Sequence, residues 1–141
     1  MPVLNAVTGR QSKPVEAFVL ALPETAGSAL YGMVDVLAAT GTLWNDLVGE
    51  EAGRQLIVPK IVSPYRKPFT CGNNIPVSPE LECRLVPPPE IVILPEMWLA
   101  PTDDLHERYG DVKEWIKHCY QEGSSIYSAC SGSVLLASTG L

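Results

Sequence analysis

Short apolar or β-prone runs alternate with longer amphipathic segments along this chain. The runs span 15–22, 55–62, 91–94 and 125–129. The first three are apolar at nearly every position, which is typical of strands covered on both faces of a sheet. Pro59 lies inside the second run and cannot donate a backbone hydrogen bond, so that strand is expected near a sheet edge or a bulge.

Helical periodicity fills two of the intervals between the strands. In 26–40 apolar residues recur every three to four positions, and Gly41 follows as a stop signal. A second helix is predicted over 103–121, with Asp103 or Asp104 as its N-cap. The buried stripe of this second helix is expected to consist of Leu105, Tyr109, Val112, Trp115, Ile116 and Cys119.

The remaining segments are interpreted as connections. Residues 44–53 are expected to form a connection or a short helical extension, and 66–79 a hairpin or an irregular excursion. Trp44 and Trp115 are interpreted as core or helix-packing residues. The alternation of strands and helices predicts a doubly wound α/β domain with a mostly parallel sheet, which places ligands at the carboxyl ends of its strands.

Composition and charge narrow the class of protein. The chain has 141 residues, of which 46% are hydrophobic and 18% are charged, and a formal net charge of -6. These values predict one domain with a substantial core and exclude a disordered tail. The basic residues are few and dispersed, so this chain is not expected to contact DNA itself. Without a membrane-length apolar run or a secretory signal, we expect a cytoplasmic protein.

The cysteines do not form a recognisable metal motif. The four are Cys71, Cys83, Cys119 and Cys130. They contain no CxxC pair, and His106 and His118 do not lie at zinc-finger spacing from them, so we expect neither a metal site nor a cofactor. Reduced thiols are the favoured state, because a hydrophobic domain of this size does not need disulfides. The two histidines are interpreted as surface residues of the predicted helix.

One segment, 125–137, combines a β-prone run, a cysteine and an apolar helix start. Cys130 lies at the junction, and its neighbours Ala129, Ser131 and Gly132 are small. This is the pattern of a nucleophile elbow, in which a sharp turn exposes the side chain and a helix N-terminus stabilises a thiolate. The alternative is an ordinary buried cysteine in a tight turn between a strand and a helix.

The same segment resembles the cysteine-elbow region of the ThiJ/PfpI superfamily. The resemblance runs through 127–141 and extends upstream through 19–23, 32–37, 71–79 and 87–95. Within this superfamily, the chain is most similar to the version that forms the N-terminal domain of AraC-type transcriptional regulators. It implies a flavodoxin-like, class I glutamine amidotransferase-like three-layer sandwich.

The departures from that family bear on catalysis. Catalytic members carry an acidic residue on the first helix, and here that position falls on Ala29. Glu24 could approach the cleft in its place, or be a solvated loop carboxylate. The glycine pair of the enzymes is replaced by Glu96 and Met97, and the chain ends before the histidine that many members carry. A cysteine without an activating partner is a poor catalyst, so Cys130 is expected to be vestigial.

The resemblance therefore implies a non-catalytic, ligand-sensing or dimerising domain of a homodimeric regulator. A small-molecule effector would bind around Glu24, Glu96, Trp98, Cys130 and Ser131. Trp98 could stack on this molecule, or cover the core or an oligomer contact. DNA would be bound only by a helix-turn-helix module outside this chain.

Domain boundaries and two alternative functions complete the expectations. Residues 1–13 are expected to form a leader, and 14–141 an amidotransferase-like domain that is incomplete at its C-terminus. The main alternative function is a ThiJ/PfpI-type enzyme, such as a hydrolase, a hydratase or a glyoxalase-like enzyme with Cys130 as nucleophile. Redox sensing through oxidation of Cys130 is a further possibility.

Overall fold

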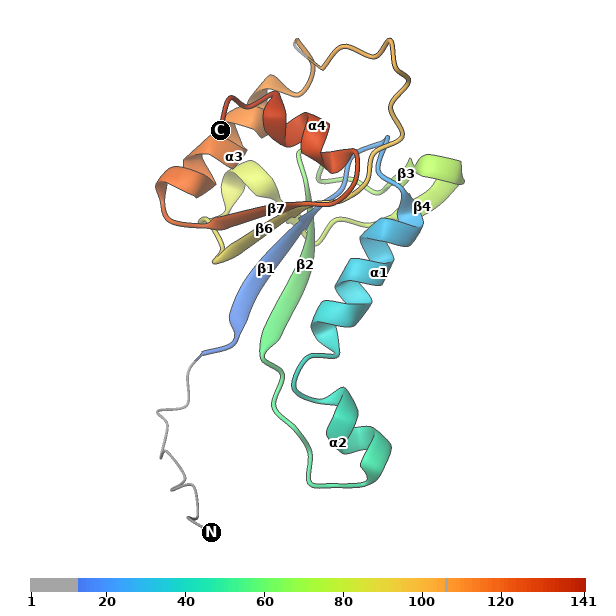
Figure 1. Ribbon diagram of the computed structural model, residues 1–141, viewed down its shortest axis with the longest axis vertical. Coiled ribbons are helices and arrows are strands. Elements are labelled where there is room, and N and C mark those ends of the chain that lie inside the picture. The colour runs from blue at the N-terminus through green and yellow to red at the C-terminus, as the bar shows by residue number, and fades with distance from the viewer. Residues whose placement is uncertain (1–12, 106) are drawn as a thin grey trace.

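A five-stranded sheet forms the centre of the protein (Figure 1). The computed structural model describes residues 13–105 and 107–141. The strands are β1 (Val15–Leu20), β2 (Ile57–Ser63), β5 (Leu81–Glu82), β6 (Ile91–Leu94) and β7 (Ser125–Ser128). Their order is β5-β2-β1-β6-β7, and all neighbours pair in parallel. The doubly wound parallel sheet predicted from the sequence is confirmed.

Helices cover both faces of this sheet, as the three-layer prediction requires. The helices are α1 (Gly27–Ala38), α2 (Leu43–Val48), α3 (Gly110–Gln121) and α4 (Gly132–Ala137). Helix α1 packs on one face, α3 and α4 lie on the other, and α2 projects beyond the lower end of the sheet (Figure 1). The remaining elements are the antiparallel hairpin β3 (Phe69–Cys71) and β4 (Ile75–Val77) and the 3-10 turns η1 (Gly72–Asn74) and η2 (Cys83–Leu85).

Successive side chains of the central strand serve two separate cores. Phe18 and Leu20 belong to the cluster that includes residues of α3 and α4, whereas Val19 belongs to the cluster beneath α1. All three are almost completely buried. The period-two alternation of a strand therefore explains why an apolar residue is needed at nearly every position of β1.

The second helix is shorter than the sequence predicts. It begins at Gly110 rather than at residue 103, and its N-cap is Tyr109, with a left-handed φ of 58°. Asp103 does not cap this helix, since its carboxylate accepts a hydrogen bond from the amide of Ala100, at 2.7 Å. Leu105 is buried but precedes the helix. The stripe residues within α3 are buried as predicted: Val112, Trp115, Ile116 and Cys119.

Two predictions about single residues have opposite outcomes. Pro59 lies at an edge, because β5 pairs only with Val62 and Ser63 and leaves the other end of β2 without a partner on that side. The core assignment of Trp44 is wrong, since this residue of α2 is 70% exposed.

The predicted leader lies outside the described residues, apart from Lys13. Within 13–105 and 107–141, no helix has the length and apolar character needed to cross a membrane.

Candidate functional site

The candidate site lies where the direction of chain progression across the sheet reverses. The chain runs from β1 outward to β2, whereas β6 pairs with the opposite side of β1 and continues to β7. Parallel sheets bind ligands outside the carboxyl ends of the strands at such a point. A hollow of about 600 Å³ is present there, lined by Glu96, Met97, Trp98, Leu99, Ala100, Cys130 and Ser131.

Cys130 occupies the turn between β7 and α4. Its side chain is exposed, and its φ of 49° lies in the left-handed region that non-glycine residues rarely adopt. The carbonyl of Cys130 accepts hydrogen bonds from the amide and the hydroxyl of Ser133, at 3.1 and 2.7 Å. The local backbone therefore holds the thiol at the surface at a conformational cost of about 1 kcal/mol. The alternative of an ordinary buried cysteine is wrong.

Gly132 is required by close packing between this turn and the end of β6. A Cβ atom at this position would lie 2.3 Å from the carbonyl oxygen of Leu94 and 2.5 Å from that of Pro95. The amide of Ala129 donates to the same Leu94 oxygen, at 2.9 Å. A hydrogen bond thus holds the turn that carries Cys130 against β6. The turn can approach β6 this closely because Gly132 has no side chain.

Ser131 connects the two loops of the hollow. Its hydroxyl accepts a hydrogen bond from the amide of Met97, at 3.0 Å, and donates to the carbonyl of the same residue, at 2.5 Å. The Met97 amide is therefore already paired and is not available to stabilise an oxyanion. This contact gives Ser131 a structural role that the sequence pattern does not reveal.

Trp98 forms one wall of the hollow. Its amide donates to the carbonyl of Glu24, at 2.7 Å, and its side chain is 47% exposed. A Cβ atom on Gly72 would lie 3.2 Å from the indole Cε3. The indole therefore rests against the η1 turn and keeps much of its surface open, so it does not fill the core.

Glu24 is held by Arg108 and Tyr109. The sequence pattern placed Tyr109 in the buried stripe of a helix and gave Arg108 no role in the site. Its carboxylate accepts hydrogen bonds from the guanidinium of Arg108 and, at 2.5 Å, from the hydroxyl of Tyr109. The guanidinium of Arg108 also lies 5.3 Å from the centre of the Tyr109 ring. The interpretation of Glu24 as a solvated loop carboxylate is therefore wrong. No sequence motif marks this cluster, because the residues are more than 80 positions apart.

The predicted site residues are only partly brought together. Glu96, Trp98, Cys130 and Ser131 line the same hollow, whereas Glu24 contacts its wall through the backbone. The backbone carbonyl of Glu96 accepts from the amide of Ala26, at 2.9 Å, just before α1. Ala29, the position of the acid in catalytic relatives, lies in the first turns of α1 and has no titratable group.

The other three cysteines have unreactive surroundings. Cys71, Cys83 and Cys119 are buried and free. Burial raises the pKa of Cys83 to about 12 and that of Cys119 to about 11, and it also raises the pKa of Cys71. These thiols therefore stay protonated near neutral pH, as expected for passive cysteines.

Within the described part of the chain, His118 and the possible metal ligands add nothing to the site. His118 is exposed on α3, and the surface prediction for His106 falls outside the described residues. Among residues 13–105 and 107–141, no cluster of His, Cys, Asp or Glu side chains is arranged to hold a metal ion.

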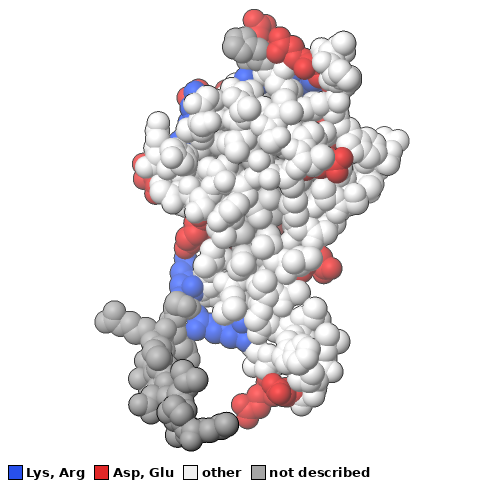
Figure 2. Space-filling model, viewed as in Figure 1, with Lys and Arg blue, Asp and Glu red and all other residues white. Residues whose placement is uncertain are grey.

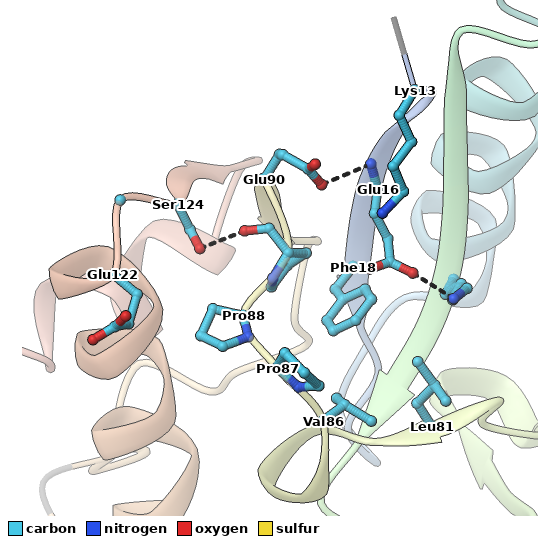
Figure 3. Close-up of a pocket in the computed structure, with 13 residues that line it drawn as sticks. Lys13, Glu16, Phe18, Leu81, Val86, Pro87, Pro88, Glu90, Glu122 and Ser124 are labelled. Carbon is cyan, nitrogen blue, oxygen red and sulfur yellow. Dashed lines mark hydrogen bonds and ion pairs between the residues drawn. The ribbon is translucent and has the colours of Figure 1, made fainter.

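A second hollow, of about 520 Å³, lies at the amino ends of β1 and β6 (Figure 3). Glu16 forms an ion pair with Lys60 there, and the Glu16 amide donates to the carboxylate of Glu90, at 3.0 Å. The hydroxyl of Ser124 donates to the carbonyl of Pro89, at 2.6 Å. These polar groups satisfy one another around an apolar floor, so this hollow is a weaker candidate than the one at Cys130.

Structural comparison finds the same fold in regulators and in ThiJ/PfpI proteins. A protein assigned as a transcriptional regulator from Vibrio parahaemolyticus is 19% identical, with a TM-score of 0.71, over 92% of this chain and 63% of its own. An AraC family transcriptional regulator from Pseudomonas putida is 12% identical, with a TM-score of 0.64, over 90% of this chain and 62% of its own. A ThiJ/PfpI family protein from Pseudomonas syringae is 18% identical, with a TM-score of 0.61, over 100% of this chain and 53% of its own.

These neighbours come from both groups that the sequence resemblance names, and at the level of fold the resemblance is confirmed. The chain spans less than two thirds of the length of each of the three proteins. No family model and no curated protein matches the sequence.

Proposed function

We propose that this chain is the ligand-sensing and dimerisation domain of an AraC-type transcriptional regulator and acts without catalysis. The observation that carries the proposal is that two backbone amides near the exposed Cys130 are already hydrogen-bonded. The amide of Met97 donates to Ser131, and the amide of Trp98 donates to the carbonyl of Glu24. A thiol without a hydrogen-bonded general base can line a binding site but is a poor catalyst.

Glu24, the residue predicted to replace the usual acid, is also hydrogen-bonded to other side chains. The carboxylate of Glu24 is bound by Arg108 and Tyr109, which leaves it little freedom to orient or deprotonate Cys130. Ala29 supplies no replacement, because a methyl group cannot titrate. Neither Ala29 nor Glu24 is therefore placed to activate Cys130, which favours binding over bond making.

In this function a small-molecule effector occupies the hollow. Trp98 offers an aromatic face, Glu96 a carboxylate, and Cys130 a small polar group at the rim. The effector acts by binding one arrangement of the regulator better than the other. The domain is a homodimer in the cytoplasm, and a helix-turn-helix module outside this chain contacts DNA, which agrees with the net charge of -6 on these residues.

The test uses the full-length protein. Selection from a random DNA library at moderate salt is expected to yield a defined sequence, and a metabolite panel is expected to include a compound that changes tryptophan fluorescence. A Trp98→Phe variant should lose this fluorescence change. If the full-length protein shows no sequence-specific DNA affinity, the regulator function is wrong.

A second candidate function is a ThiJ/PfpI-type enzyme with Cys130 as nucleophile. It is favoured by the exposure of this thiol and by its φ of 49°, since strained residues cluster at functional sites. The discriminating experiment compares turnover of small aldehydes, amides and nitriles by the wild type and by Cys130→Ser. Turnover that disappears in Cys130→Ser would establish the enzyme, and absence of turnover in both would exclude it for these substrates.

A further inference from the structure

Helix α2 is amphipathic, but its apolar side faces solvent. Leu43, Trp44, Leu47 and Val48 fall within about 140° of the helix circumference. Their exposed fractions are 49%, 70%, 72% and 45%, and α2 contains no buried residue. An isolated exposed leucine is ordinary, whereas four large apolar side chains on one face of one helix mark an interaction surface.

Asn45, on the polar side of α2, contacts the segment that follows the helix. The side-chain amide of Asn45 donates to the carbonyl of Glu51, at 3.0 Å, and a Cβ atom on Gly53 would lie 3.0 Å from its Oδ1. The C-terminal residue Gly49 has a φ of 69° and ends the helix. These contacts hold the segment after α2 away from the apolar residues, which stay exposed.

A fifth exposed apolar side chain lies beside the connection that leads into α2. Leu56 is 55% exposed, and its amide donates to the carbonyl of Thr40, at 3.1 Å, in the connection that leads into α2. We define the α2 face as Leu43, Trp44, Leu47, Val48 and Leu56. In the space-filling view the lower lobe of the molecule, where α2 lies, is mostly uncharged, with acidic side chains at its lower edge and basic side chains where it meets the rest of the molecule (Figure 2).

We propose that the α2 face is a two-fold dimer interface and that its occupant is the α2 face of a second copy of this chain. Its five side chains expose about 400 Å² of apolar surface. Two copies would bury about 800 Å² from these side chains alone, most of the ~1,000 Å² that a specific interface needs. A two-fold contact pairs the surface with itself, so apolar atoms meet apolar atoms.

The charges around the α2 face fit an antiparallel arrangement of the two helices. Glu50 and Glu51 are exposed just after the C-terminal end of α2. In an antiparallel pair the acidic residues of the two copies lie at opposite ends of the interface. This inference rests on the proposed function only in giving the dimer a purpose, namely to couple two DNA-binding modules.

Sedimentation of the full-length protein without DNA tests the interface. The wild type is expected to be a dimer, and Leu47→Glu and Trp44→Lys are each expected to raise the dimer dissociation constant about 100-fold or more, because they bury a charge in an apolar contact. Leu85→Glu is the matched control, since Leu85 is 68% exposed in η2, outside the α2 face. Because α2 contains no buried residue, both variants should keep the wild-type circular dichroism spectrum.

A second measurement does not depend on a destabilising charge. Leu47→Cys in a Cys130→Ser background should be cross-linked into dimers by a short bismaleimide, whereas Leu85→Cys in the same background should not. A wild-type dimer that survives both charge substitutions, or a wild-type monomer, would overturn the interface. A monomer whose Trp44 is protected from acrylamide, by comparison with Trp44→Phe, would show that the same polypeptide covers the face. Loss of DNA affinity in an intact dimer would instead count against the regulator function alone.

Discussion

Ser131 and Met97 form two hydrogen bonds through a single hydroxyl group. The Ser131 oxygen accepts from the Met97 amide at 3.0 Å and donates to the Met97 carbonyl at 2.5 Å. This pair joins the turn after β7 to the loop after β6, and both loops line the candidate ligand site. Binding geometry and loop stability are therefore coupled through one side chain.

Ser131→Ala should destabilise the protein by about 1–3 kcal/mol, because it leaves the amide and carbonyl of Met97 without a side-chain partner. Urea denaturation measures the change. Ser133→Ala is the matched control, since its exposed hydroxyl only supplements a backbone hydrogen bond to Cys130 and should cost less. Equal losses in the two variants would contradict the bridging role of Ser131.

Gly132→Ala should lower the unfolding free energy more than an alanine substitution at a glycine with free space around it. The new methyl group would lie 2.3 Å from the carbonyl oxygen of Leu94, which is backbone and cannot move aside without disturbing β6. We expect a loss of about 1–3 kcal/mol in unfolding free energy. Gly32→Ala is the control, because nothing lies within 4 Å of its Cβ position and it is helical. There the substitution should be neutral or stabilising.

Native alkylation should modify Cys130 alone. Cys130 is the exposed cysteine, whereas Cys71, Cys83 and Cys119 are buried and have raised pKa values. Iodoacetamide at pH 8 should therefore add one carbamidomethyl group to the folded protein and four in denaturant, as counted by mass spectrometry. Cys130→Ser should add none when folded. Two or more modifications of the folded wild type would contradict the burial of the other thiols.

Stability should fall as the pH rises above about 9. The pKa of Cys83 is raised to about 12 and that of Cys119 to about 11 from an ordinary value of 9.0, so the folded state binds these protons more tightly than the unfolded state. The unfolded chain ionises first, and each thiol costs up to about 1.4 kcal/mol for each pH unit above that value.

Urea denaturation at pH 8 and pH 10 measures this dependence on pH. A Cys83→Ala/Cys119→Ala variant serves as the control, and its unfolding free energy should change less between the two pH values. An identical pH dependence in the variant and the wild type would rule out these two thiols as the source.

Glu24→Gln should affect stability rather than thiol reactivity. The Glu24 carboxylate binds Arg108 and Tyr109, so its neutralisation removes a charge-assisted pair. Because the Arg108 side chain is 40% exposed, the expected cost is modest, about 1 kcal/mol. The alkylation rate of Cys130 at pH 8 should stay within about twofold of the wild-type rate. A large change in that rate would favour the enzyme alternative, in which Glu24 serves as the acid.

The sequence by itself determined four of the five strands of the sheet, all except β5, and the place of the cysteine turn. Continuous apolar runs and helical periodicity are local signals, and β1, α1 and the turn at Cys130 follow from them directly. Pro59 also predicted that its strand lies near a sheet edge, because a proline, which has no amide donor, is tolerated only where the partner strand is absent.

Only the tertiary structure decided which polar groups are occupied and which apolar groups are exposed. The partners of Glu24 come from the loop before α3, more than 80 residues away, and no local pattern encodes that contact. The same holds for Trp44, whose apolar character predicted burial, whereas the fold leaves the apolar side of α2 exposed. Helix periodicity specifies that a face exists, whereas the packing of the whole chain decides what that face meets.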